Sequence, residues 1–195
     1  MAHGKNRYYA RLEEQMGCCT SCAEAVGRML QRGDDSETLC RRALARAEAI
    51  RHEIGDALAR EFMPPMDPEK LLDLSEHLRT LTASLGDVPR LTGGERTGEL
   101  ALWQAVAPCL PPLARAVAVL DSKRPEPALE AVRAVFACAV QADDAHRRLT
   151  RELFCRPLSP QMLTVSLHAY ESLRRVVAVT RRAAHHVEQI LLRRG

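Results

Sequence analysis

The sequence has 195 residues, enough for a substantial hydrophobic core in one domain or two small ones. Its net charge is only +3, and aromatic residues make up 4% of a composition dominated by Ala, Leu, Arg and Glu, which favours helices over sheets. No apolar stretch approaches the roughly 20 residues of a membrane-spanning helix, and the polar N-terminus does not resemble a signal peptide. We therefore expect a cytoplasmic protein with reduced cysteines.

Helix caps, helix breakers and the spacing of apolar residues predict six long helices. They are expected at about 7–31, 36–62, 68–85, 98–120, 128–154 and 160–193. Gly33 should end the first helix, and Pro111 and Pro112 should kink or break the fourth. The segment 86–94, which contains three Gly and one Pro, is the clearest predicted linker.

A ten-residue phrase occurs twice, at 62–71 and 154–163, and both copies read F-x-x-P-[ML]-[DS]-P-x-x-L. Asp67 and Ser159 suit helix N-caps, and Pro68 and Pro160 then take the first helical position, where a missing N–H costs nothing. Each copy predicts a helix end, a sharp turn and a new helix. We expect one all-α domain over 1–195, an antiparallel bundle of two three-helix halves at about 7–92 and 97–194.

The last predicted helix is amphipathic and basic. Its apolar residues recur at spacings of three and four: Leu163, Leu167, Tyr170, Leu173, Val177, Ala184, Val187 and Leu191. Residues 151–195 contain eight Arg and three acids, and this basic end could meet an acidic partner, an anionic membrane surface or nucleic acid. We take Arg174, Arg175, Arg181 and Arg182 as the candidate surface for a partner. Nucleic-acid binding is not expected, because no aromatics interleave with the basic residues and no helix-turn-helix pattern stands out.

Three segments carry a resemblance to a known family: YYARLEEQ at 8–15, FMPPMDP at 62–68 and YESL at 170–173. In this order they resemble PhoU-like proteins, in particular the branch of phosphate transport regulators associated with Pit-type phosphate permeases. The resemblance implies two three-helix halves and a non-enzymatic role in phosphate transport or its regulation. The implied partner is a phosphate transporter or a phosphate-signalling protein, with homo-oligomers as a further option and membrane association only through the partner.

The resemblance also implies a metal bound by carboxylates on the helix faces, but few of those acids are present. The corresponding positions hold Leu44, Glu48, Arg79, Thr80, Ala139, Asp143, Ala178, Arg181, Arg182 and His185. Only Glu48 and Asp143 are acidic, whereas iron, magnesium or manganese needs several oxygen ligands. We expect the multinuclear site to be absent. Arg79 and the arginines of the last helix would instead suit an anion such as phosphate.

Two other functions stay open, a metal-binding helical bundle and a diverged PhoU-like scaffold of unrelated role. The first would use close pairs of ligands, drawn from Glu48, His52, Asp56, Asp143, His146 and His185. Polar residues on solvated helix faces are the commoner origin of such pairs. No cofactor is expected, and no nucleophile elbow, phosphate-binding Gly loop or zincin motif indicates an enzyme.

The seven cysteines are interpreted as core residues. Cys19 and Cys22 form a C-x-x-C spacing, but no second ligand pair accompanies it as a structural zinc site would require. Buried cysteine behaves as a small hydrophobe. The same interpretation extends to the scattered Cys40, Cys109, Cys138 and Cys155.

Overall fold

The protein is a bundle of long helices, seen here in a computed structural model that describes residues 6–61, 67–93, 96–122 and 124–192. The helices are α1 (Arg7–Arg32), α2 (Glu37–Arg60), α3 (Pro68–Leu91), α4 (Arg96–Val106), α5 (Leu110–Ala118), α6 (Glu126–Phe154) and α7 (Pro160–Leu192), with a 3-10 helix, η1 (Ala107–Cys109), between α4 and α5. The described residues contain no strand. The predicted all-α fold is confirmed, with α4, η1 and α5 together taking the place of the fourth predicted helix.

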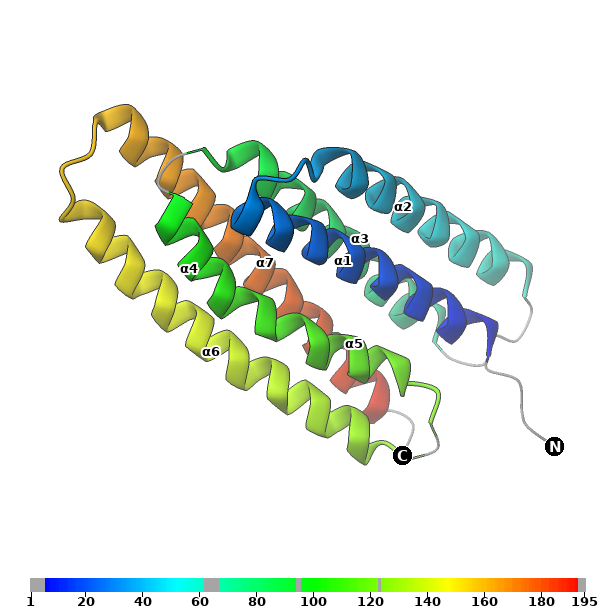
Figure 1. Ribbon diagram of the computed structural model, residues 1–195. Coiled ribbons are helices and arrows are strands. Elements are labelled where there is room, and N and C mark those ends of the chain that lie inside the picture. Colours follow the sequence, from blue (N-terminus) through cyan, green and yellow to red (C-terminus); the bar gives the residue numbers. More distant parts are fainter. Residues whose placement is uncertain (1–5, 62–66, 94–95, 123, 193–195) are drawn as a thin grey trace.

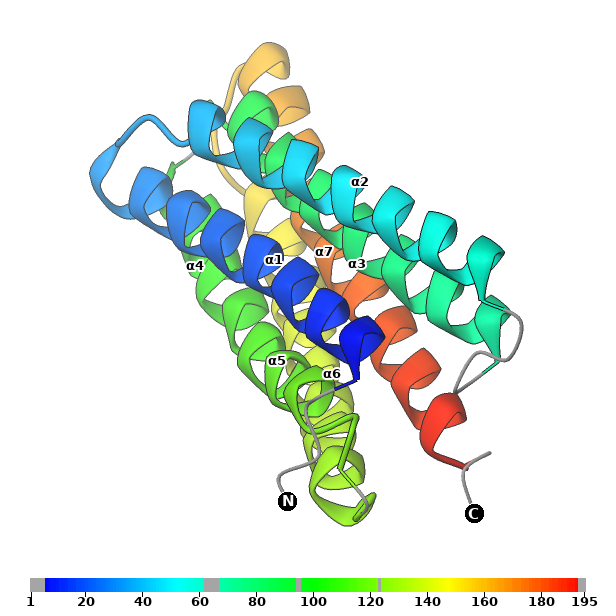
Figure 2. The same ribbon diagram turned by 90° about the vertical axis from the view of Figure 1, so that its right-hand side faces the viewer.

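The helices lie roughly along one axis and form an elongated bundle (Figure 1). The first three helices pack on one another, α6 packs on α4, α5 and α7, and α3 lies along α7. The view in Figure 2 shows α2 on the outside of the bundle, where it contacts α1 and α3. The equivalence of the two halves as a repeated unit, at about 7–92 and 97–194, stays a prediction.

The predicted helix caps are present in the structure. Asp67 accepts a hydrogen bond from the backbone N–H of Glu69 at 3.1 Å, and Pro68 opens α3. The Ser159 hydroxyl accepts from the N–H of Met162 at 3.3 Å, and Pro160 opens α7. Both proline positions therefore begin helices as the repeated phrase predicts. Residues 62–66 of the first copy lie outside the described residues.

Gly33 ends α1 with φ at 83°, in the left-handed region that only glycine adopts without strain. The predicted end of the third helix at Leu85 is wrong, because α3 runs on through Gly86 and Pro89 to Leu91. Leu85 and Val88 are fully buried in this stretch. Their burial stabilises the last turns of α3 by more than the breakers cost.

The fourth predicted helix breaks before the expected prolines. The α-helical hydrogen-bonding changes at η1, which contains Pro108, and not at Pro111 and Pro112. Pro111 and Pro112 lie in the first turn of α5, where the absent N–H groups have no helical acceptor to lose. The pair therefore starts a helix instead of interrupting one.

The core holds most of the cysteines, as expected, but Cys155 is an exception. Cys19, Cys22, Cys40 and Cys109 are buried, and Cys18 and Cys138 are half-buried. Cys155 is exposed, so its assignment to the core is wrong. It follows the last residue of α6, in the turn to α7, where no other helix covers it.

Among the described residues, no helix combines the length and apolarity needed to cross a bilayer.

Candidate functional site

Four of the positions where the family resemblance places acids form salt bridges between neighbouring helices. On α3, the Arg79 guanidinium binds the Glu76 carboxylate through two nitrogens at 2.6 and 3.0 Å. It also lies 3.8 Å from Glu48 on α2. Arg51 of α2 reaches Glu76 at 2.7 Å, so these residues form one network across the two helices. The hydrogen bond from Arg79 is the main cause that lowers the pKa of Glu76.

A second pair forms between α6 and α7. Asp143 of α6 accepts a hydrogen bond from Arg181 of α7 at 2.5 Å. The two acids that remain from the family pattern, Glu48 and Asp143, therefore each face an arginine of the neighbouring helix. An anion at Arg79 or Arg181 would have to displace a carboxylate that is already bound.

The six candidate metal ligands are distributed over separate helices. Glu48, His52 and Asp56 lie on α2, which packs on α1 and α3, and the side chains of His52 and Asp56 are exposed. The remaining three are Asp143 and His146 on α6 and His185 on α7. In the described parts of the chain, no group of three or more His, Cys, Asp or Glu side chains comes close enough to hold a metal ion.

Two of the candidate histidines make contacts with other side chains. His146 is half-buried and its ring meets Tyr170 edge-on, with centroids 6.5 Å apart. Burial is the main cause that lowers the pKa of His146. His185 is exposed and lies 3.3 Å from Glu188. Gln189 also lies within hydrogen-bonding distance of His185, at 3.0 Å. His146 is thus held by packing against Tyr170, and His185 interacts with neighbours one helical turn away.

The four arginines proposed on α7 divide into two kinds. Arg174 is bound by Glu171, one turn earlier, at 2.6 Å, and Arg181 is bound by Asp143. Arg175 and Arg182 are exposed, and no carboxylate of the described residues lies within salt-bridge distance of either. The guanidinium groups of Arg174 and Arg181 are therefore occupied by carboxylates, whereas those of Arg175 and Arg182 are accessible to a partner.

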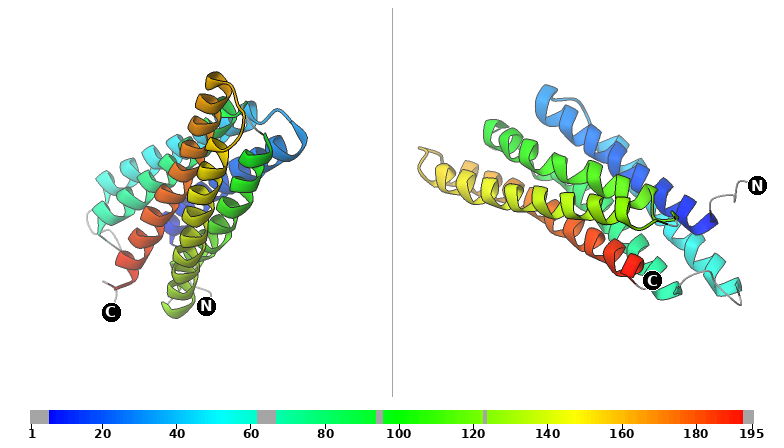
Figure 3. Two further views of the ribbon diagram at one scale, coloured as in Figure 1. Left: turned by 90° about the vertical axis from the view of Figure 1, so that its left-hand side faces the viewer. Right: turned by 90° about the horizontal axis from the view of Figure 1, so that it is seen from below.

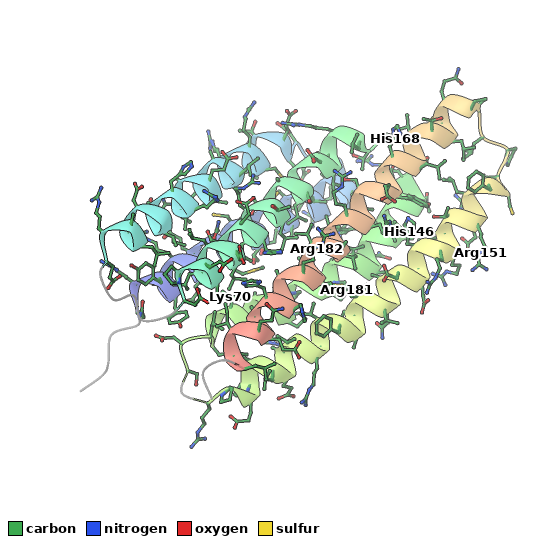
Figure 4. The ribbon with its side chains drawn as sticks, turned by 180° about the vertical axis from the view of Figure 1, so that it is seen from behind. Lys70, His146, Arg151, His168, Arg181 and Arg182 are labelled. Carbon is green, nitrogen blue, oxygen red and sulfur yellow. The ribbon has the colours of Figure 1, made fainter. Side chains whose placement is uncertain are left out.

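The open arginines share one face of α7 with an exposed histidine. Arg175 and Arg182 are seven residues apart, about two helical turns, and His168 lies seven residues before Arg175. We call these three residues the α7 basic face. Figure 4 shows His168 and Arg182 along α7, with Arg181 next to them and His146 on the adjacent α6. Two guanidinium groups and one imidazole are thus presented at a regular helical spacing along the outside of the bundle.

One pair of contacting residues was not foreseen from the sequence. His77 of α3 and His186 of α7 stack with ring centroids 5.4 Å apart. His186 is only 7% exposed, and its Nε2 lies 3.1 Å from the carbonyl oxygen of Lys70. Burial is the main cause that lowers the pKa of His186. The spacing of His186 from the buried Ala183 and Ile190 on the same helix could have indicated its burial.

An apolar groove lies between α1 and the α4–α5 segment and measures about 580 Å³. Gly27 makes a close approach possible here, since a Cβ on it would lie 3.1 Å from Nε1 of Trp103. The groove is lined mainly by small and apolar side chains, such as Ala23, Leu110 and Ala114. Its polar lining residues include Thr20, Glu24 and Arg28 of α1.

Comparison with known proteins shows similarity in structure but not in sequence. No protein-family model and no curated protein sequence matches the chain. Two solved structures from Shewanella oneidensis MR-1 match it over 95% of its length and 99% of theirs, at 16% identity each. One is described as a PhoU-like protein (TM-score 0.79), the other as a PhoU-like phosphate regulatory protein (TM-score 0.77). At this identity the likeness concerns the fold alone, and the chain has the helical-bundle fold of PhoU-like proteins.

Proposed function

We propose that this protein is a non-enzymatic, cytoplasmic regulator or accessory protein of inorganic phosphate transport. It acts by binding a partner protein, a Pit-type phosphate permease or a phosphate-signalling protein. The fold supports this role, since one of the similar structures is described as a phosphate regulatory protein. The same role is supported by the three sequence segments that resemble the permease-associated branch of the family.

The observation that carries the proposal is the α7 basic face. Arg175 and Arg182 are exposed, and no carboxylate of the described residues lies within salt-bridge distance of either, so their charges are available to an acidic surface. Arg174 and Arg181 are bound by Glu171 and Asp143, and we expect them to stabilise the fold instead of binding the partner. The interface therefore depends on His168, Arg175 and Arg182 more than on all four arginines equally.

Phosphate itself is a second ligand class for the same face, because guanidinium groups suit phosphate oxygens. Arg79 and Arg181 are already bound to carboxylates, so an anion site rests on Arg175 and Arg182. Isothermal titration with phosphate, sulfate and nucleotides tests it. The absence of heat with all three ligands would refute anion binding without affecting the protein interface.

The proposal is tested by binding of the purified protein to a detergent-solubilised Pit-type permease of the same organism. The double substitution Arg175→Glu and Arg182→Glu should weaken binding at least about tenfold, or about 1.4 kcal/mol. The matched control is Arg28→Glu with Arg133→Glu, which reverses two exposed arginines on other helices. Equal binding by the two double variants would contradict the assignment of the interface.

A metal-binding bundle is the alternative function, and none of the observed contacts favours it. Its ligands would have to come from His52, Asp56, Asp143, His146 and His185, which are divided between α2 and the α6–α7 pair. Metal analysis of the purified protein separates the two functions. One or more equivalents of a transition metal would support the alternative.

A further inference from the structure

The hairpin formed by α6 and α7 extends beyond the other helices at one end of the bundle. Figure 1 shows its turn as the outermost point of that end, and the right-hand view of Figure 3 shows the same projection from below. We call residues 147–165 the hairpin tip. It comprises the last turns of α6, the connecting turn and the first turns of α7. The other helices leave the end of this hairpin uncovered.

The hairpin tip exposes large apolar side chains. Phe154 is 61% exposed, and Met162 and Val165 are each 37% exposed. The other exposed large hydrophobic side chains of the described residues are dispersed over several elements: Leu39, Leu91, Val140 and Leu192. Single exposed apolar residues are ordinary, whereas a group of them at one place is typical of an interaction surface.

The hairpin tip is also cationic. It contains Arg147, Arg148, Arg151 and Arg156 and one acid, Glu152. Asp144, one turn before the tip, binds Arg147, and no acid occurs from 153 to 170. Arg148 lies 3.9 Å from Glu152 in an exposed pair, which holds it weakly. Arg151 is exposed, and no carboxylate of the described residues lies within salt-bridge distance of it. In Figure 4 Arg151 lies on the side of α6 that faces away from the bundle.

We propose that the hairpin tip binds directly to the surface of an anionic lipid bilayer. Phe154, Met162 and Val165 enter the boundary between headgroups and acyl chains, while Arg148 and Arg151 contact lipid phosphate groups. A bilayer matches both properties of the tip, since it removes apolar side chains from water and attracts cations to its surface. An acidic protein surface that lacks an apolar pocket would match the charge but would leave the exposed Phe154 largely in water.

This contact differs from the sequence-based expectation that the protein reaches a membrane only through a partner. It does not depend on the proposed role in phosphate transport, because the α7 basic face and the hairpin tip use different arginines. A protein with both surfaces would be held at the membrane by its tip while Arg175 and Arg182 meet the partner.

The test is sedimentation of the full-length protein with lipid vesicles. The protein should sediment with vesicles of phosphatidylcholine and phosphatidylglycerol, and much less with phosphatidylcholine alone or at high salt. Phe154→Ser with Met162→Ser should lower the partition coefficient at least about tenfold, and so should Arg148→Glu with Arg151→Glu. The matched controls are Val140→Ser and Arg133→Glu, which change an exposed apolar residue and an exposed arginine of α6 outside the tip.

Three results would overturn the proposal. The first is an unmodified protein that stays in the supernatant with the anionic vesicles. The second is equal sedimentation of the tip variants and their controls, with all variants sharing the same circular dichroism spectrum. The third is a lipid-free protein that light scattering shows to be a dimer and that becomes a monomer on Phe154→Ser. The tip would then be the contact between two copies of the protein. Loss of vesicle binding with permease binding retained would support the tip proposal independently.

Discussion

The pairing of Arg181 with Asp143 gives the clearest prediction, because it separates structural from open arginines on α7. The side chains are 42% and 30% exposed, and their closest nitrogen and oxygen lie 2.5 Å apart. Such a half-exposed pair stabilises a protein by about 0.2–1 kcal/mol. Arg181→Ala should therefore lower the free energy of unfolding by up to about 1 kcal/mol, or about 2–4 °C in Tm for a chain of this size.

The assay is urea unfolding of a double-mutant cycle made of Arg181→Ala, Asp143→Ala and the double variant. The coupling energy should be positive and should fall at high salt. Arg175→Ala and Arg182→Ala are the matched controls and should change stability by less than about 0.5 kcal/mol, because they remove no carboxylate contact. A coupling energy of zero, or an equal loss in the controls, would refute the division of these arginines into two kinds.

Three further predictions concern buried groups and thiols. Gln15 is fully buried and donates to the carbonyls of Ala47 and Ser75 at 3.0 Å, so Gln15→Leu should destabilise the protein by about 2–3 kcal/mol in urea unfolding. Burial lowers the pKa of His186, so the folded state binds its proton less readily than the unfolded state. Stability should then fall as the pH drops below about 6.5, and His186→Gln should reduce that fall in thermal melts. Burial raises the pKa of the Cys19 and Cys109 thiols to about 12, so a maleimide should label the exposed Cys155 first, which mass spectrometry of peptides would show.

The residues that carry the family resemblance in α1 turn out to have structural contacts. Tyr8 is buried, and its hydroxyl donates to the Glu61 carboxylate at the end of α2. Gln15 connects α1 to both α2 and α3 through two backbone carbonyls and the Ser75 hydroxyl. These contacts explain how a short opening phrase can indicate a fold while saying little about function.

Much of the fold could be predicted because its signals are local. The caps Asp67 and Ser159 and the apolar spacing of α7 depend only on neighbouring residues. The end of α3 could not be predicted in this way. Gly86 and Pro89 oppose a helix locally, but the burial of Val88 against the bundle stabilises it, and that burial is a property of the packed structure.

The candidate site was predicted less completely for the same reason. The spacing of Glu171 and Arg174, three residues apart, already indicates a pair within one helix. The pairing of Arg181 with Asp143 depends on the register between α6 and α7, and the stack of His77 on His186 depends on the register between α3 and α7. A sequence alone contains neither register, so the difference between bound and open arginines had to come from the structure.

The central claim, a role in phosphate transport exercised through the α7 basic face, is tested most directly by phosphate uptake in cells. The measurement compares the parent strain, a strain lacking the gene and a strain whose only copy carries Arg175→Glu and Arg182→Glu. The strain without the gene and the strain with Arg175→Glu and Arg182→Glu should show the same change in phosphate uptake relative to the parent. A strain with Arg28→Glu and Arg133→Glu should take up phosphate like the parent. Uptake that is unaltered by loss of the gene would contradict the central claim.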